Sequence, residues 1–195
     1  MSVGHKAVVR GIVVGVSPSG DGSLRVRMYT DVLGLVWAFA KSAREERSKL
    51  RAHLLSGTRG IFSLVKGRDT WRITGASATQ NVHFASSGSS YAQTSAARVL
   101  SFVRQFVRVE GSDPYFFETL WNFFEGLPYP TEAIQRDAEC VAILRMLAAL
   151  GYVDPSPSLL PFLEEPYAPS LIKGSNASRA ILVKAVNDGM SASGL

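Results

Sequence analysis

The spacing of apolar residues changes near residue 85, and this change constrains the fold more than any other feature of the chain. Before it, apolar residues alternate or form short β-branched runs, as at 7–16, which is typical of strands. After it they recur every three or four residues, as in helices. The small polar stretch 85–90 separates the two patterns. The sequence therefore predicts a β domain followed by an α domain.

The first part of the chain contains five predicted strands, at 7–16, 24–30, 35–41, 59–66 and 71–79. A turn cluster at 17–22 ends the first strand. In the second, Leu24, Val26 and Met28 alternate with Arg25, Arg27 and Tyr29, which predicts one buried and one wet face. Residues 42–55 suit a loop that leads into a short helix, and 67–70 a hairpin turn. This order favours a small Greek-key barrel of the OB type.

The second part predicts a helical bundle. Helices are expected at 91–109, at 115–127 after Asp113 and Pro114, at about 131–150 with Gly151 at the end, and from about 175 to 188. Five prolines between 154 and 169 exclude a single helix there. We therefore expect an OB-fold domain at 1–82, a linker at 83–90 and a helical domain at 91–195.

Charge is divided unequally between these two parts. The whole chain of 195 residues has a net charge of +5, but residues 1–80 hold 13 Lys/Arg against 5 Asp/Glu, and residues 81–195 hold 8 against 11. A positive field concentrated in one half favours a polyanion such as nucleic acid. The alternative is a basic domain whose charge serves only its solubility.

Arginines and aromatic rings meet on the predicted wet face. Arg25, Arg27 and Tyr29 are expected there, with Trp37 on the neighbouring strand, and guanidinium groups bind phosphates while rings stack bases at about 1–3 kcal/mol each. Alternatively, Trp37 and Phe39 pack beneath the helical half. The basic run 41–51 is either a phosphate contact or a solvated face. The candidate nucleic-acid-binding residues are Arg10, Arg25, Arg27, Tyr29, Trp37, Lys41, Arg44, Arg47, Lys49, Arg51 and Arg72.

Signatures of catalysis and of metal binding are missing from the sequence. Gly15 and Gly20 have the spacing of a phosphate-binding loop, but Asp21 stands where that loop needs Lys. The single cysteine, Cys140, and the three histidines are too scattered for a zinc site. We therefore expect no enzyme activity, no metal and no cofactor. An apolar run of about 18 residues and an apolar leader are also missing, which predicts a cytoplasmic protein without membrane contact.

Several short motifs resemble those of the bacterial recombination mediator RecO family. They lie, in the order and spacing of that family, at 11–16 with 20–24, at Tyr29-Thr30 with Gly34, at 40–44, at 48–50 and at 71–76. The helical half, with 150–152, fits more loosely. Many relatives carry a four-cysteine zinc site after the positions of Gly151 and Tyr152, where this chain has prolines, so it resembles a short member without zinc.

The resemblance implies a non-catalytic, nucleoid-associated protein of DNA repair. Such a protein binds single- and double-stranded DNA, anneals complementary strands and assists loading of the RecA recombinase on DNA coated by single-strand-binding protein, together with RecR. In relatives the helical domain can bind the acidic tail of single-strand-binding protein. Here an apolar stripe is either such a groove or core; its residues are Phe116, Phe117, Leu120, Phe123 and Phe124, with Arg104 or Arg108 for carboxylates.

Two rival functions remain open at this stage. One is a generic OB-fold binder of single-stranded DNA or RNA without mediator activity, and the other is an adaptor whose basic barrel binds an acidic protein.

Overall fold

Strands and helices occupy separate parts of the chain, as the change in apolar spacing predicts. The computed structural model describes residues 5–68, 70–108, 111–164, 167 and 176–194. The chain divides into two units, one formed by Met1–Ala85 with Val107–Asp113 and the other by Ser86–Phe106 with Pro114–Leu195. The segment Val107–Asp113 therefore belongs with the strands, although the sequence placed it in the helical domain.

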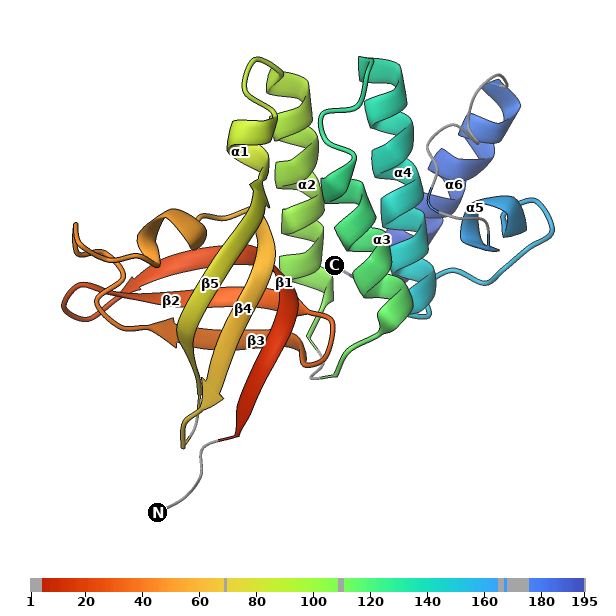
Figure 1. Cartoon of the computed structure of the whole chain (residues 1–195). Coiled ribbons are helices and arrows are strands. Elements are labelled where there is room, and N and C mark those ends of the chain that lie inside the picture. Colours follow the sequence, from red (N-terminus) through yellow and green to blue (C-terminus); the bar gives the residue numbers. More distant parts are fainter. Residues whose placement is uncertain (1–4, 69, 109–110, 165–166, 168–175, 195) are drawn as a thin grey trace. The chain divides into compact units, whose positions relative to one another are not determined.

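Five strands close into a barrel in the order β1-β2-β3-β5-β4 (Figure 1). They are β1 Lys6–Ser19, β2 Ser23–Thr30, β3 Gly34–Ala40, β4 Thr58–Lys66 and β5 Trp71–Asn81. The first half of β1 pairs with β4 and its second half with β2, so this one long strand closes the barrel. The pairing of β3 with β5 is parallel, whereas the other pairings are antiparallel.

The first strand extends further than predicted. Ser17 to Ser19 were expected in a turn, but they continue β1 and pair with Arg25 to Ser23 of β2. The turn itself is confined to the residues around Gly20 and Gly22, whose φ angles are 54° and 70°. Because glycine adopts positive φ without a Cβ penalty, these two residues, rather than the serine and proline before them, set where the chain reverses.

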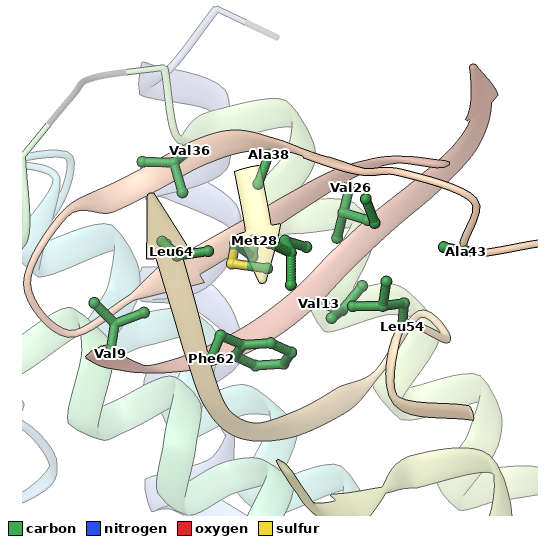
Figure 2. Packing of buried hydrophobic residues seen from close by; sticks show 12 residues of the cluster. Val9, Val13, Val26, Met28, Val36, Ala38, Ala43, Leu54, Phe62 and Leu64 are labelled. Carbon is green, nitrogen blue, oxygen red and sulfur yellow. The ribbon is translucent and has the colours of Figure 1, made fainter. Parts of the chain in front are cut away.

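The barrel interior is filled by alternate residues of the strands. Figure 2 shows Met28 and Phe62 in the middle of this cluster, with Val9, Val36 and Leu64 to one side. Leu54 and Ala43, from the segment between β3 and β4, pack against the same cluster near Val13 and Val26. That segment contains the short 3₁₀ helix η1, Arg51–His53, which confirms the expected loop leading into a short helix.

The second unit consists of helices packed around one central helix. After α1, Val82–Ala85, which belongs to the barrel unit, come α2 Ser90–Phe106, α3 Pro114–Glu125, α4 Glu132–Ala149, α5 Leu160–Glu164 and α6 Asn176–Ala192. Helices α2, α3 and α6 each pack against α4 (Figure 1). The stretch 83–90 was expected as a linker, but its first residues, up to Ala85, belong to α1.

Local signals explain the ends of α4 and its polar contacts. Thr131 caps the helix by accepting a hydrogen bond from the Ile134 amide at 3.2 Å, and Gly151, with φ of 78°, follows its last turn. Inside the unit, Glu139 of α4 accepts hydrogen bonds from Ser95 at 2.7 Å and Arg98 at 2.5 Å, both on α2. These bonds satisfy the half-buried carboxylate, so they tie α2 to α4.

Gly111 and Ser112 lie closely against the turn between β2 and β3. The Ser112 hydroxyl donates to the backbone carbonyl oxygens of Asp31 at 2.5 Å and Thr30 at 3.3 Å. Gly34, with φ of 67°, approaches Gly111 so closely that a Cβ at position 34 would overlap the Gly111 carbonyl oxygen. This end of the barrel therefore depends on a segment that is distant in the sequence.

Candidate nucleic-acid interface

Trp37 and two arginines form a cluster on the outer surface of the barrel. The register of β2 and β3 places Arg27 opposite Trp37 and Arg25 opposite Phe39. The Arg25 guanidinium lies 4.1 Å from the centre of the Trp37 ring, and that of Arg27 lies 5.6 Å from it. Trp37 is 40% exposed, so its ring lies at the surface of the barrel. The alternative of a buried ring therefore does not hold for Trp37, whereas Phe39 is half-buried.

The two arginines of this cluster differ in their surroundings. Arg25 is exposed, whereas Arg27 is half-buried and donates from Nη2 to the Val107 carbonyl oxygen at 3.2 Å. Part of the Arg27 hydrogen-bonding capacity is therefore used inside the protein. Of the two arginines, Arg25 is the one whose guanidinium both lies over the Trp37 ring and is exposed to solvent.

A hollow of about 590 Å³ opens beside Trp37. Arg25, Trp37, Lys66 and Trp71 line it, together with residues of the β2–β3 turn. The parallel pairing of Ala38 with Trp71 brings the second tryptophan here, and the Lys66 ammonium lies 5.0 Å from the centre of its ring. The hollow thus combines two indole rings with two cations, which suits bases and phosphates.

Trp71 and Lys66 were not among the candidate binding residues. The signal that would have found them is the hairpin turn at 67–70. Lys66 comes directly before this turn and Trp71 directly after it, so the hairpin brings a cation and an aromatic ring together. Arg72, which was a candidate, is exposed on β5 and pairs in register with Phe39. Arg72 does not itself line the hollow.

One other candidate, Tyr29, is corrected by the structure, and a second, Arg10, has a carboxylate partner. Tyr29 was expected on the wet face, but it is 2% exposed, and burial raises its pKa to about 12. The alternation of β2 stops at its end, where Met28, Tyr29 and Thr30 are all buried. Arg10 forms an ion pair with Asp31, with Nε and Oδ2 3.3 Å apart. This pair offsets the charge that Arg10 would offer to a phosphate.

The basic run 41–51 is exposed at its cationic residues, but none of them lines the hollow beside Trp37. Arg44 donates to the Gly20 carbonyl oxygen at 2.9 Å, and Arg47 pairs with Glu45 at 3.2 Å. Hydrogen bonds from Ser42 and Arg47 lower the pKa of Glu45. The other cations of the run are Lys41, Lys49 and Arg51. The run is therefore a neighbouring basic surface, separate from the indole rings.

The apolar stripe on α3 is core. Its residues are all buried, with exposed fractions of 2% or less: Phe116, Phe117, Leu120, Phe123 and Phe124. Of the two alternatives, groove or core, the burial of these side chains supports the core, because they have no exposed surface to offer a peptide. Arg104 is exposed on α2, and Arg108 is exposed in the segment that belongs to the barrel unit.

Metal-binding clusters and membrane-spanning helices are not found in the described part of the chain. Within those residues no three His, Cys, Asp or Glu side chains come together as a metal site would need. The chain has one cysteine, Cys140, whose pKa is raised by burial, so the four-cysteine zinc site of many relatives does not fit this chain. No helix among the described residues is long and apolar enough to cross a membrane.

Comparison with known proteins connects the barrel to one family. Residues 5–82, which contain all five strands, match the family described as Recombination protein O N terminal. The chain is also 30% identical over 134 residues to DNA repair protein RecO of Dehalococcoides mccartyi, a match that covers 68% of this chain and 52% of the relative. The chain thus spans about half the length of that curated relative. With the matching motifs on the same five-stranded barrel, residues 5–82 are similar to the N-terminal domain of the RecO family.

Proposed function

We propose that this chain is a non-catalytic DNA-binding protein of recombinational repair, and that it binds single strands across the barrel surface formed by β2, β3 and β5. The observation that carries the proposal is the exposed Trp37 ring with the Arg25 guanidinium 4.1 Å from its centre, beside an open hollow. The similarity of residues 5–82 to the RecO N-terminal domain, and of the chain to a DNA repair protein, supports a role in repair. The barrel would act as an OB fold, whose second and third strands are the usual binding face.

The physical basis of binding is a division of labour between charge and rings. Arg25, Lys66 and Arg72 meet phosphates, and the indoles of Trp37 and Trp71 stack bases that are free of a duplex. A double helix keeps its bases stacked internally, so it engages the cations alone. We therefore propose binding to both forms, with the rings adding affinity only for single strands.

The mediator activities follow from the same chemistry. Annealing requires that two anionic strands approach each other, which a surface that neutralises phosphates promotes without any catalytic group or cofactor. We propose that the chain anneals complementary strands and assists recombinase loading on DNA coated by single-strand-binding protein, with RecR as partner. The name of the relative, DNA repair protein RecO, supports the part of this proposal that concerns repair.

Substitution of Trp37 tests the binding site. Trp37→Ala is expected to weaken single-strand binding by about tenfold, because a stacked base contributes about 1–3 kcal/mol. Duplex affinity should change much less, and the melting temperature little, since the ring is already 40% exposed. Fluorescence anisotropy with a labelled oligonucleotide, alone and as a duplex, measures both affinities.

The control for that experiment is Phe84→Ala, which removes another exposed ring of the same unit that does not line the hollow. If both substitutions lower the affinity for single strands equally, the proposal that bases stack on Trp37 is refuted.

A strand-annealing assay then separates the family function from its rivals. A chain that binds single strands but slows their pairing is a generic OB-fold binder. A chain with no measurable DNA affinity is better explained as a protein-binding adaptor.

A further inference from the structure

A second hollow lies elsewhere on the barrel unit and shares no residue with the one beside Trp37. It has a volume of about 320 Å³ and is formed where the ends of β1 and β2 meet the segment between β3 and β4. Its walls are mostly aliphatic: Val16, Leu24, Ala43, Leu54 and Leu55. Leu54 and Ala43 are buried and belong to the barrel core, whereas Val16 is 37% and Leu55 43% exposed. An apolar surface is therefore open to solvent here.

Two arginines also line this hollow. Arg44 and Arg51 are both exposed, and Arg44 is held in place by its hydrogen bond to the Gly20 carbonyl oxygen at 2.9 Å. Within the described part of the chain, neither arginine forms an ion pair with a carboxylate. Two uncompensated positive charges thus flank an apolar floor, and the basic run 41–51 adds to their field.

The chemistry of the lining discriminates between the two classes of anionic partner. A nucleic-acid strand would use the arginines, but its bases stack on aromatic rings, and none of the residues around this hollow is aromatic. An acidic peptide uses both features, because its carboxylates form bidentate bonds with arginine and a large apolar side chain displaces water from the aliphatic walls.

We propose that this hollow, between Arg44, Arg51 and Leu55, is a docking site for an acidic segment of a partner protein that carries a large aliphatic or aromatic side chain between its carboxylates. The partner docks on the barrel at a place distinct from the indole rings. The barrel unit then holds a DNA strand and a protein segment at separate sites.

The test uses the full chain and a fluorescein-labelled peptide of glutamates interrupted by leucines. This peptide is expected to bind, whereas a version with lysines for glutamates and a version with serines for leucines are expected to bind at least about tenfold more weakly. Equal binding of all three peptides, or no binding of the first, overturns the proposal without depending on any variant.

Substitutions then locate the site. Arg51→Glu and Leu55→Ser are each expected to lower the affinity for the peptide by about tenfold, since central contacts dominate small interfaces. Two matched control substitutions should change this affinity by less than about threefold. Arg47→Glu makes the same charge change within the basic run, and Ile61→Ser removes another exposed aliphatic side chain, and neither residue lines the hollow.

Competition distinguishes a protein site from a part of the DNA site. A single-stranded oligonucleotide should leave most of the peptide bound, and Leu55→Ser should leave DNA affinity unchanged. Suppose instead that the oligonucleotide displaces the peptide, and that Arg51→Glu and Leu55→Ser lower the affinities for peptide and DNA equally. The hollow is then part of the DNA surface, and the docking site is refuted. That result would leave the proposed DNA-binding function intact.

Discussion

At the scale of single residues, the interface depends on how Arg25 and Trp37 share one surface. The guanidinium gains about 0.5–1 kcal/mol from an exposed ring at this distance, which keeps the long side chain ordered without neutralising its charge. A carboxylate partner would order it equally well but would cancel the field that attracts phosphate. Arg10 shows this second arrangement, because it pairs with Asp31 at 3.3 Å.

Tyr29 shows what burial does to a residue two positions along the same strand from Arg27. Its hydroxyl is removed from water, which disfavours the phenolate and raises its pKa from 10.0 to about 12. The folded chain therefore keeps this proton to a higher pH than the unfolded chain does. Its contribution to stability is complete below pH 10 and is lost as the pH rises towards 12.

We accordingly predict that the free energy of unfolding falls between pH 10 and 12, and that Tyr29 accounts for about 2–3 kcal/mol of the fall, from a pKa change of 10.0 to about 12. Tyr29→Phe should make the decline shallower. Urea denaturation across this range measures the effect, and absorbance of the phenolate checks that one tyrosine with a raised pKa has disappeared from the titration. The same pH dependence in parent and variant would contradict the assignment.

At the scale of elements, the sequence predicted which segments are strands and helices, because each has a strong apolar period and clear turn residues. It could not predict burial at strand ends. Tyr29 and Arg27 occupy equivalent positions in the alternation, yet one is buried and the other is not, since burial depends on what covers each end of the barrel. Nor could it separate groove from core on α3, because both need the same apolar stripe.

Long-range pairing explains the remaining differences in the site. Trp71 joins the hollow only because β5 lies parallel to β3, and no local pattern reports a parallel pairing between distant strands. The return of Val107–Asp113 to the barrel unit also lies beyond local signals, because its contacts are a hydroxyl and two glycines that no periodicity marks.

That return segment leads to a prediction about Gly34. Gly34→Ala should lower the free energy of unfolding by about 3 kcal/mol, because the left-handed backbone costs about 1–2 kcal/mol and the overlap with the Gly111 carbonyl oxygen adds about 1–3. Gly20→Ala is the matched control. It shares the positive φ, but its Cβ would meet nothing within 4 Å, so we expect only the backbone cost. Equal losses in urea denaturation would refute the close contact.

At the scale of the whole chain, both proposed binding sites lie in the part that carries the positive charge. The strand-rich part has the excess of Lys and Arg, and the helical part has an excess of Asp and Glu. Both hollows discussed above are lined entirely by residues of the barrel unit. The helical unit instead pairs several of its cations internally, as Arg98 does with Glu139 and Arg179 with Asp137. Long-range attraction of a polyanion therefore comes from the barrel.

This division predicts how DNA affinity responds to salt. If the barrel neutralises about four to six phosphates, the logarithm of single-strand affinity should fall with the logarithm of salt concentration with a slope of roughly −3 to −4. The double variant Arg25→Ala/Arg27→Ala should make that slope shallower by about one, and should weaken all sequences alike, because phosphate contacts carry no base information. Most of this effect belongs to Arg25, since Arg27 also binds the Val107 carbonyl oxygen.

The control, Arg136→Ala/Lys184→Ala, removes the same charge from the helical unit. Both cations are exposed, and their ion pairs, each at 3.6 Å, lie within their own helices. Anisotropy titrations at several salt concentrations should give this control the slope of the parent. If both double variants shift the slope equally, the charge of the whole chain drives binding and the Arg25 surface is not the DNA site. A parent slope near zero would remove the electrostatic basis of the interface altogether, because each phosphate contact must release counterions.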